Sequence, residues 1–262
     1  MQTPVNPFKQ ALLEGRPQTG LWLSLADAYA AEVVAGSGAD WLLIDGEHSP
    51  LTIDKTLAML QTLAAYPVAP VVRPLWNDKA LIKQLLDIGA TNLLLPYVQS
   101  AEEAAQIVRW TRYAPRGVRG MASGAVRASR FGRVGDYIGR CEQELCLVAQ
   151  IETRGALDCL EEIAAVEGID ALFVGPADLA ADLGYAGQPG HPEVVAAVED
   201  ALQRIAAVGK APGVLSVDLE LARRYAEAGS VFTAVGVDIV MLARSSEHVV
   251  ASFREHALPA DS

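Results

Sequence analysis

The sequence contains few cysteines, no long apolar segment and no excess of positive charge. Its three cysteines, Cys141, Cys146 and Cys159, are odd in number and lack the spacing of a metal site, which predicts reduced thiols in a cytoplasmic protein. No apolar run approaches the roughly 18 residues of a membrane span, and the polar residues 1–18 lack the apolar core of a signal peptide. A formal charge of −11 disfavours nucleic acid or an anionic membrane as a partner.

Strand-like and helix-like segments alternate along the whole chain, which is typical of a parallel α/β fold. Eight strands and eight helices in 262 residues, without a linker, predict one (β/α)8 TIM-barrel domain over residues 1–262. A doubly wound open sheet is the alternative, but no G-x-G-x-x-G motif follows the first strand. The expected strands are 20–25, 41–45, 70–75, 92–97, 147–152, 171–175, 213–217 and 232–242. The expected helices lie near 27–37, 53–65, 79–89, 101–113, 155–166, 193–208, 218–228 and 245–256.

One connection, residues 115–144, is about thirty residues long and interrupts this alternation. Connections of this length in compact domains are usually functional or interfacial. The arginines in and around it either pair with acidic helices or a neighbouring subunit, or offer a substrate anion the bidentate guanidinium fork. Arg119 and Arg127 are the candidates for that second role, from this subunit or a neighbouring one. The group comprises Arg109, Arg112, Arg116, Arg119, Arg127, Arg130, Arg133 and Arg140.

Two carboxylates follow successive strands at corresponding positions. Glu152 comes after the strand that begins near residue 147, and Asp178 comes shortly after the next strand. In a closed parallel barrel the carboxyl ends of the strands meet at one mouth, so both side chains would face a shared cavity. Two hard oxygen ligands suit a divalent cation that keeps positions open for substrate. Gln150 lies two residues before Glu152, on the same side of the strand, and is a candidate for a metal-bound water or a substrate oxygen.

The second expected strand ends in the sequence IDGEH, residues 44–48. His48 is one of four histidines, and it alone stands at the end of an expected strand. A general base that works near neutral pH is most often histidine, and a neighbouring carboxylate fixes its tautomer. A lone histidine is more often structural, but beside Asp45 at a barrel mouth we expect His48 to carry a proton.

Arg73 lies at the end of the third expected strand, after an apolar run, where a cation is costly unless it meets an anion. It either forms a structural ion pair with Asp45 or Glu47, or stabilises a developing oxyanion, and we favour the second role. After the sixth strand, Gly175 allows the backbone to approach a ligand closely. The amides that follow it either bind a carboxylate or belong to an ordinary turn.

Lysine is scarce, and its positions bear on the mechanism. Schiff-base catalysis in a barrel requires a lysine at the carboxyl end of a strand, and none of the five is expected there. A metal ion, an arginine and a histidine with a carboxylate, without such a lysine, suit the stabilisation of an enolate. The five are Lys9, Lys55, Lys79, Lys83 and Lys210.

Taken together, these motifs resemble the metal-dependent pyruvate aldolases of the HpcH/HpaI family. The resemblance covers nearly the full length of the chain, with no departure at the catalytic positions. Each motif is weak alone, but the set is specific because the order and spacing also agree. The matching segments are 20–23, 41–48, 71–74, 150–153, 175–179 and 235–238.

The resemblance implies a role for each site residue. Glu152 and Asp178 would hold Mg²⁺, Mn²⁺ or Co²⁺, chelated in turn by pyruvate. Arg73 would stabilise the enolate oxygen, and His48 with Asp45 would move the proton of the C4 hydroxyl. The amides of Ala177 and Asp178 would bind the pyruvate carboxylate, and Trp22 and Leu215 would line the aldehyde side of the pocket. The residues expected to contact substrate are Trp22, Glu47, Gln150, Gly175, Pro176, Ala177 and Leu215.

The implied reaction is the reversible cleavage of 4-hydroxy-2-oxoheptane-1,7-dioate to pyruvate and succinic semialdehyde, in homoprotocatechuate degradation. The implied assembly is a hexamer of swapped dimers in which the last helix is exchanged. Three alternatives stay open. They are a sugar-acid pyruvate aldolase, a lyase of a CoA thioester, whose phosphates the arginine-rich connection would suit, and a non-catalytic barrel that binds pyruvate or oxalate. A non-catalytic barrel would not need a His48–Asp45 pair, because it moves no proton.

Overall fold

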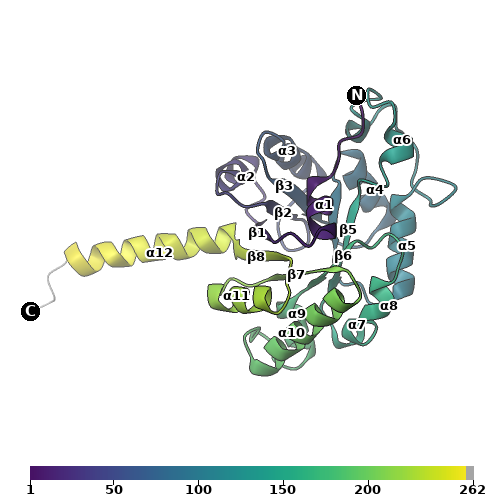
Figure 1. Ribbon diagram of the computed structural model, residues 1–262. Helices are drawn as coiled ribbons and strands as arrows, with labels where there is room; N and C mark the ends of the chain where they lie inside the picture. Colours follow the sequence, from purple (N-terminus) through teal and green to yellow (C-terminus); the bar gives the residue numbers. More distant parts are fainter. Residues whose placement is uncertain (258–262) are drawn as a thin grey trace, which may run out of the picture.

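The structure, a computed structural model, describes the backbone of residues 1–257 and the side chains of residues 1–254. Its strands form a closed barrel in chain order, each parallel to its neighbours (Figure 1). Pairing of β1 with β8, from Gln18 opposite Phe232 to Trp22 opposite Val237, completes the ring. The expected (β/α)8 fold is therefore confirmed. The strands are Gln18–Leu23 (β1), Trp41–Asp45 (β2), Ala69–Arg73 (β3), Asn92–Leu95 (β4), Cys146–Ile151 (β5), Ala171–Val174 (β6), Ala211–Leu215 (β7) and Phe232–Val237 (β8).

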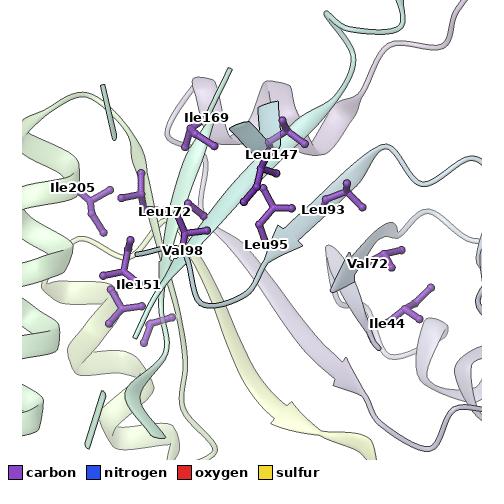
Figure 2. Packing of buried hydrophobic residues seen from close by; sticks show 14 of the residues in the cluster. Ile44, Val72, Leu93, Leu95, Val98, Leu147, Ile151, Ile169, Leu172 and Ile205 are labelled. Carbon is purple, nitrogen blue, oxygen red and sulfur yellow. The ribbon is translucent and has the colours of Figure 1, made fainter. Parts of the chain in front are cut away.

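The strands are buried on both faces, as parallel strands covered by helices must be. Alternate side chains point outward and pack beneath the helices, as Ile44 and Val72 do on neighbouring strands (Figure 2). The side chains between them point inward and fill the barrel, where Trp41 and Phe232 lie with their ring centroids 5.9 Å apart. Two apolar layers thus surround each strand, and only the strand ends are left for polar side chains.

Helices surround the barrel, and several are capped by the aspartate that precedes them. Asp27, Asp78 and Asp218 each accept N–H bonds from the first turn of the helix that follows. The helices after the first four strands are Ala28–Ala35 (α2), Ile53–Leu63 (α3), Lys79–Asp87 (α4) and Ala101–Thr111 (α5). Those after the last four strands are Arg154–Asp158 (α7), Leu160–Ala164 (α8), Pro176–Asp182 (α9), Pro192–Ala207 (α10), Leu219–Glu227 (α11) and Asp238–Ala257 (α12). None of the described helices is long and apolar enough to cross a membrane.

Two segments lie at the amino-terminal ends of the strands. Pro7–Leu13 (α1), which the sequence did not predict, places Phe8 against Trp41 inside the barrel, with the ring centroids 5.9 Å apart. The long connection between α5 and β5 contains two short helices, Arg127–Ser129 (η1) and Tyr137–Arg140 (α6). Because this connection joins a helix to the following strand, it lies at the end of the barrel opposite the expected catalytic mouth.

The last expected strand, 232–242, is wrong beyond Val237, because α12 begins at Asp238. The Asp238 carboxylate accepts N–H bonds from Ser24 at 2.7 Å and from Ile239 at 2.7 Å, so it ties the start of the helix to the end of β1. Beyond this point α12 projects away from the barrel (Figure 1). Its apolar side chains are 40–72% exposed, namely Ile239, Val240, Met241, Leu242, Val249, Val250 and Phe253.

Candidate active site

A buried ion pair joins the ends of two neighbouring strands. Asp45 at the end of β2 lies opposite Arg73 at the end of β3. Arg73 Nε donates to Asp45 Oδ1 at 3.0 Å, and Arg73 Nη2 lies 2.9 Å from the same oxygen. Arg73 Nη1 lies 2.8 Å from Glu47 Oε2. The structural ion pairs that the sequence left as an alternative are therefore present, and they fix the guanidinium at the mouth of the barrel.

His48 lies outside this pair, with 64% of its side chain exposed. Its Nε2 is 3.7 Å from Glu47 Oε2. Asp45 Oδ1 instead accepts the backbone N–H groups of Glu47 at 3.1 Å and His48 at 3.4 Å. These backbone amides take up Asp45 Oδ1, and the expected orientation of the imidazole by Asp45 stays a prediction. Among the described side chains, the carboxylate in contact with the imidazole is that of Glu47.

Glu152 directly follows β5 and is almost fully buried. Its Oε1 accepts the backbone N–H of Tyr97 at 2.7 Å, and its Oε2 accepts Gln150 Nε2 at 2.5 Å. Tyr97 has a φ of +53°, a left-handed conformation that costs a tyrosine about 1–2 kcal/mol. Gln150 Oε1 is buried and has no hydrogen-bond partner among the described residues. This amide oxygen is free to accept a bond from a ligand.

The carboxylates at the mouth act on one another electrostatically. Burial raises the pKa of Glu152 to about 7, the Tyr97 N–H lowers it, and the charges of Asp178 and Glu47 raise it further. Burial also raises the pKa of Glu47, where Arg73 and His48 oppose the shift and Asp45 and Asp178 add to it. A divalent cation beside Glu152 and Asp178 would relieve this mutual repulsion.

Gly175 allows the side chains of Glu152 and Gln150 to lie close to the backbone. A Cβ at this position would lie 2.7 Å from Glu152 Oε2 and 3.0 Å from Gln150 Nε2. Gly175 caps α9, so the expected turn is in fact the start of a helix. Pro176 is its buried first residue, while Ala177 and Asp178 are exposed in the first turn, where backbone amides have no intrahelical acceptor.

The residues present fit a divalent cation bound by few protein groups. Among the described residues, no three His, Cys, Asp or Glu side chains are arranged to hold a metal by themselves. Two carboxylates that leave several positions to water and substrate are nevertheless the usual arrangement for Mg²⁺. The unpartnered Gln150 oxygen, the raised pKa of Glu152 and the close approach of Glu152 to Gly175 all agree with a cation at this place.

Trp22 and Leu215 lie inside the barrel below the mouth. Trp22 is 4% exposed, and the Arg73 guanidinium carbon is 5.4 Å from its ring centroid. Leu215 ends β7, is half-buried and packs on the same inner cluster. Trp22 lies beneath Arg73, and Leu215 packs on the cluster that contains Trp22; contact of either residue with an aldehyde stays a prediction.

Sequence reasoning missed the support of Glu152 from two neighbouring loops. Asn77, after β3, donates its Nδ2 to the carbonyl oxygen of Pro96 at 2.6 Å, directly before the Tyr97 amide that binds Glu152. The rings of Trp76 and Tyr97 lie 5.9 Å apart on the same two loops. The Tyr97 group that binds Glu152 is a backbone amide, which no residue type reveals. The one signal in the sequence was Pro96, which follows a short apolar strand and indicates a turn.

Arg119 and Arg127 lie at the other end of the barrel. Arg119 Nη2 lies 2.7 Å from Asp87 Oδ1, and Arg127 Nη1 donates to the Ile88 carbonyl at 2.8 Å. Asp87 and Ile88 end α4, which runs back to the amino-terminal ends of the strands. Within one subunit, the expectation that either arginine meets a substrate anion is therefore wrong.

The fold is that of a TIM-barrel enzyme, and its mouth places a buried arginine near two carboxylates that suit a cation. Comparison with known proteins gives the family: residues 18–245 match the HpcH/HpaI aldolase/citrate lyase family. The chain belongs to this family and is a class II pyruvate aldolase, a divalent-metal-dependent class of enzyme with small-molecule substrates.

Relatives and solved structures agree over nearly the whole chain. The chain is 56% identical over 252 residues to the 4-hydroxy-2-oxo-heptane-1,7-dioate aldolase of Klebsiella pneumoniae, covering 96% of this chain and 95% of that protein. It is 54% identical to the Escherichia coli protein of that name, covering 96% of each. The crystal structure of an HpcH/HpaI aldolase/citrate lyase family protein from Burkholderia cenocepacia has a TM-score of 0.91 and 39% identity, covering 95% of this chain and 100% of that one.

Proposed function

We propose that this protein is the divalent-metal-dependent aldolase that cleaves 4-hydroxy-2-oxoheptane-1,7-dioate reversibly to pyruvate and succinic semialdehyde, in homoprotocatechuate degradation. The observation that carries the proposal is the position of a buried, ion-paired Arg73 at the same mouth as Glu152 and Asp178. The substrate is taken from relatives at 54–56% identity that bear the name of this aldolase.

The cation would be held by Glu152 and Asp178, beside the free amide oxygen of Gln150. We propose Mg²⁺, Mn²⁺ or Co²⁺, because carboxylate oxygens are hard ligands. When bound, the cation supplies Lewis-acid stabilisation of negative charge on the oxygens of the pyruvate half.

Arg73 stabilises the oxyanion that develops on the keto oxygen as the carbon–carbon bond breaks. Its guanidinium is held by Asp45 and Glu47 and is 6% exposed, so it needs little reorganisation during the reaction. Preorganised donors of this kind act on charge that grows in the transition state, and only such interactions raise the rate of the chemical step.

His48 carries the proton of the C4 hydroxyl, and Glu47, 3.7 Å from its Nε2, supports the charged imidazole. Loss of this proton allows the C3–C4 bond to break, which releases the aldehyde. The enolate of pyruvate, stabilised by Arg73, then takes up a proton at C3. Asp45 holds Arg73 and the turn that bears His48.

The remaining residues bind and shape the substrate. The free amides of Ala177 and Asp178, in the first turn of α9, bind the pyruvate carboxylate. Gly175 and Pro176 set the position of that turn, and the aldehyde chain lies on the side of Trp22 and Leu215.

The test is pyruvate release from 4-hydroxy-2-oxoheptane-1,7-dioate, before and after treatment with EDTA and after the return of each cation. Cleavage that stops on chelation and returns with metal in the parent protein, but not in Glu152→Gln, supports the proposal. Restored cleavage of 2-keto-3-deoxy sugar acids alone would keep the mechanism and change the substrate. Cleavage of a CoA thioester alone would indicate a CoA-thioester lyase instead of an aldolase. Pyruvate binding without turnover would indicate a non-catalytic barrel.

We also propose that the protein assembles by exchange of α12 between subunits, into a hexamer of swapped dimers. Support comes from the exposed apolar side chains of α12, which projects from its own barrel (Figure 1). A groove between β1, β8 and α11, lined by Leu219, Ala222 and Val235, is the candidate seat for the helix of a second copy. Removal of residues 243–262 should give a species with fewer subunits in light scattering coupled to gel filtration. An unchanged number of subunits would contradict the exchange.

We further propose that the chain forms one catalytic domain, since the strands from residue 18 to residue 237 belong to one barrel. A cytoplasmic location is proposed on the ground that Cys141, Cys146 and Cys159 are free thiols. Limited proteolysis that yields two stable fragments would contradict the first proposal, and export of the protein would contradict the second.

A further inference from the structure

A cavity of about 430 Å³ lies at the amino-terminal ends of β3 and β4, opposite the catalytic mouth. Its walls come from the segment before α1, the end of α3 and the long connection between α5 and β5. Most of the lining is apolar, with Leu60, Leu63 and Val68 on one side. Ligand sites in proteins have volumes of roughly 300–1,000 Å³ and a mainly apolar lining, so the cavity is large enough for a small organic molecule.

Most polar groups in the lining already have partners within the protein. Asn6 Nδ2 donates to Asn92 Oδ1 at 2.7 Å, and Asn92 Nδ2 donates to the Pro70 carbonyl at 2.8 Å. Glu144 accepts the Asn6 N–H at 2.8 Å and lies 3.6 Å from Arg140. The lining also contains two arginines, Arg127 and Arg130, whose charges none of these contacts neutralises.

Arg127 and Arg130 have no acidic partner in the part of the chain whose side chains are described. Three other arginines of this region do have one: Arg112 lies 2.8 Å from Glu142, Arg116 lies 2.6 Å from Glu167, and Arg119 lies 2.7 Å from Asp87. Burial and the charge of Arg130 both lower the pKa of the Arg127 guanidinium. Two neighbouring cations beside an apolar cavity, in a protein of net charge −11, form a local positive site that an anion would neutralise.

The turn that carries these arginines is held by the fold. Arg130 and Phe131 both have left-handed backbones, with φ of +54° and +58°. The buried Ser129 hydroxyl donates to the Val126 carbonyl at 3.0 Å and accepts the Gly132 N–H at 3.0 Å, which closes the turn. Non-glycine residues in this conformation are rare and gather at ligand sites, where the surrounding contacts hold them.

We propose that this cavity binds a small organic monocarboxylate, whose carboxylate pairs with Arg127 and Arg130 and whose apolar body lies against Leu60, Leu63 and Val68. Guanidinium and carboxylate form short, charge-assisted bonds, and the apolar wall gains by excluding water from the rest of the molecule. The site lies at the opposite end of the barrel from Arg73 and Glu152 and takes no part in the proposed reaction.

The test uses the full-length, metal-loaded protein, with its catalytic mouth saturated by pyruvate, and 4-phenylbutanoate as the probe in titration calorimetry. The neutral analogue 4-phenylbutanol and inorganic phosphate are titrated in parallel. Arg127→Gln should weaken binding of 4-phenylbutanoate by about tenfold or more, because it removes a charge-assisted bond. Arg133→Gln is the matched control, since Arg133 belongs to the same connection, donates to the Arg130 carbonyl and does not line the cavity.

A second variant, Ala64→Phe, leaves both arginines in place and fills part of the cavity from an exposed position at the end of α3. It should also weaken binding, with pyruvate release unchanged in all three variants. The proposal is overturned if 4-phenylbutanoate gives no heat, or if neither Arg127→Gln nor Ala64→Phe weakens it. It is equally overturned if the probe binds only in the absence of pyruvate, or if phosphate or the neutral alcohol binds as tightly.

Discussion

Replacement of Gly175 by alanine tests whether the position of the Glu152 carboxylate determines metal binding. Gly175 has a φ of −96°, which alanine adopts without strain. The added Cβ would lie 2.7 Å from Glu152 Oε2, 3.0 Å from Gln150 Nε2 and 3.0 Å from Glu152 Cβ. The change therefore adds one methyl group next to the carboxylate and little else.

The size of the effect follows from these distances. Ordinary van der Waals contact begins at 3.4 Å, so Oε2 must move by about 0.7 Å, which is 3.4 minus 2.7. Functional groups tolerate displacements of about 0.5 Å, and disturbed neighbours of metal ligands typically weaken affinity by about ten- to a hundredfold. Alanine also restricts the unfolded chain, which stabilises by about 0.4–1 kcal/mol, so the variant should remain folded.

The assay is Mn²⁺ binding followed by electron paramagnetic resonance, with thermal unfolding measured on the same samples. Gly155→Ala is the matched control, because Gly155 lies just after β5 in α7 and a Cβ there meets nothing within 4 Å. Gly175→Ala should lose about ten- to a hundredfold in Mn²⁺ affinity, while Gly155→Ala keeps the parent value. Equal affinity in the two variants would refute the role assigned to Glu152.

Four further predictions concern the groups around the same mouth. Arg73→Ala should lose about 3 kcal/mol of transition-state stabilisation, measured as kcat/KM for pyruvate release, and near-parent turnover would remove Arg73 from the mechanism. Asn77→Ala removes the bond to the Pro96 carbonyl and should weaken Mn²⁺ binding about fivefold through the Tyr97 amide, and unchanged affinity would show that the loop is held otherwise. Burial raises the pKa of Glu152 to about 7; the charges of Asp178 and Glu47 add to this shift and the Tyr97 N–H opposes it. Below that pH, protons therefore compete with the cation for Glu152. Mn²⁺ affinity should then fall about tenfold per pH unit below 7 and level off above it. In the metal-free protein this carboxyl should lower the free energy of unfolding as pH rises from 4.5 to about 7, since the folded state disfavours its ionised form, and a denaturant titration that shows no such loss would contradict the assignment.

The alternation of strands and helices was predictable because buried parallel strands leave an apolar signature. The end of β8 was not predictable, because the apolar run from Ile239 to Leu242 is compatible with a strand and also with a helix that exposes apolar side chains. α9 was missed because Gly175 and Pro176 suggest a turn, although a proline at the first position is also a helix start.

The site was predictable to the extent that strand ends carry polar side chains in a barrel. Asp45 and Arg73 meet because their strands are neighbours, which chain order implies, and because the two residues lie opposite each other in register. The partner of His48 depended on the backbone of the turn, whose amides occupy Asp45 and leave Glu47 beside the imidazole. The positions of Arg119 and Arg127 depended on which end of the barrel the long connection covers. Their sequence neighbourhood suggested function, whereas the direction of α5 places them away from the mouth.

The closure of β8 onto β1 also affects how the protein is made. Gln18 of β1 lies opposite Phe232 of β8, so one edge of β1 finds its partner only after the residues between these two have been synthesised. At about 5–20 residues per second, β1 waits on the order of ten seconds or more with one edge unpaired. An open strand edge is a template for pairing with other chains. The newly made protein is therefore most exposed to aggregation during translation, and slow codons late in the message would lengthen that period.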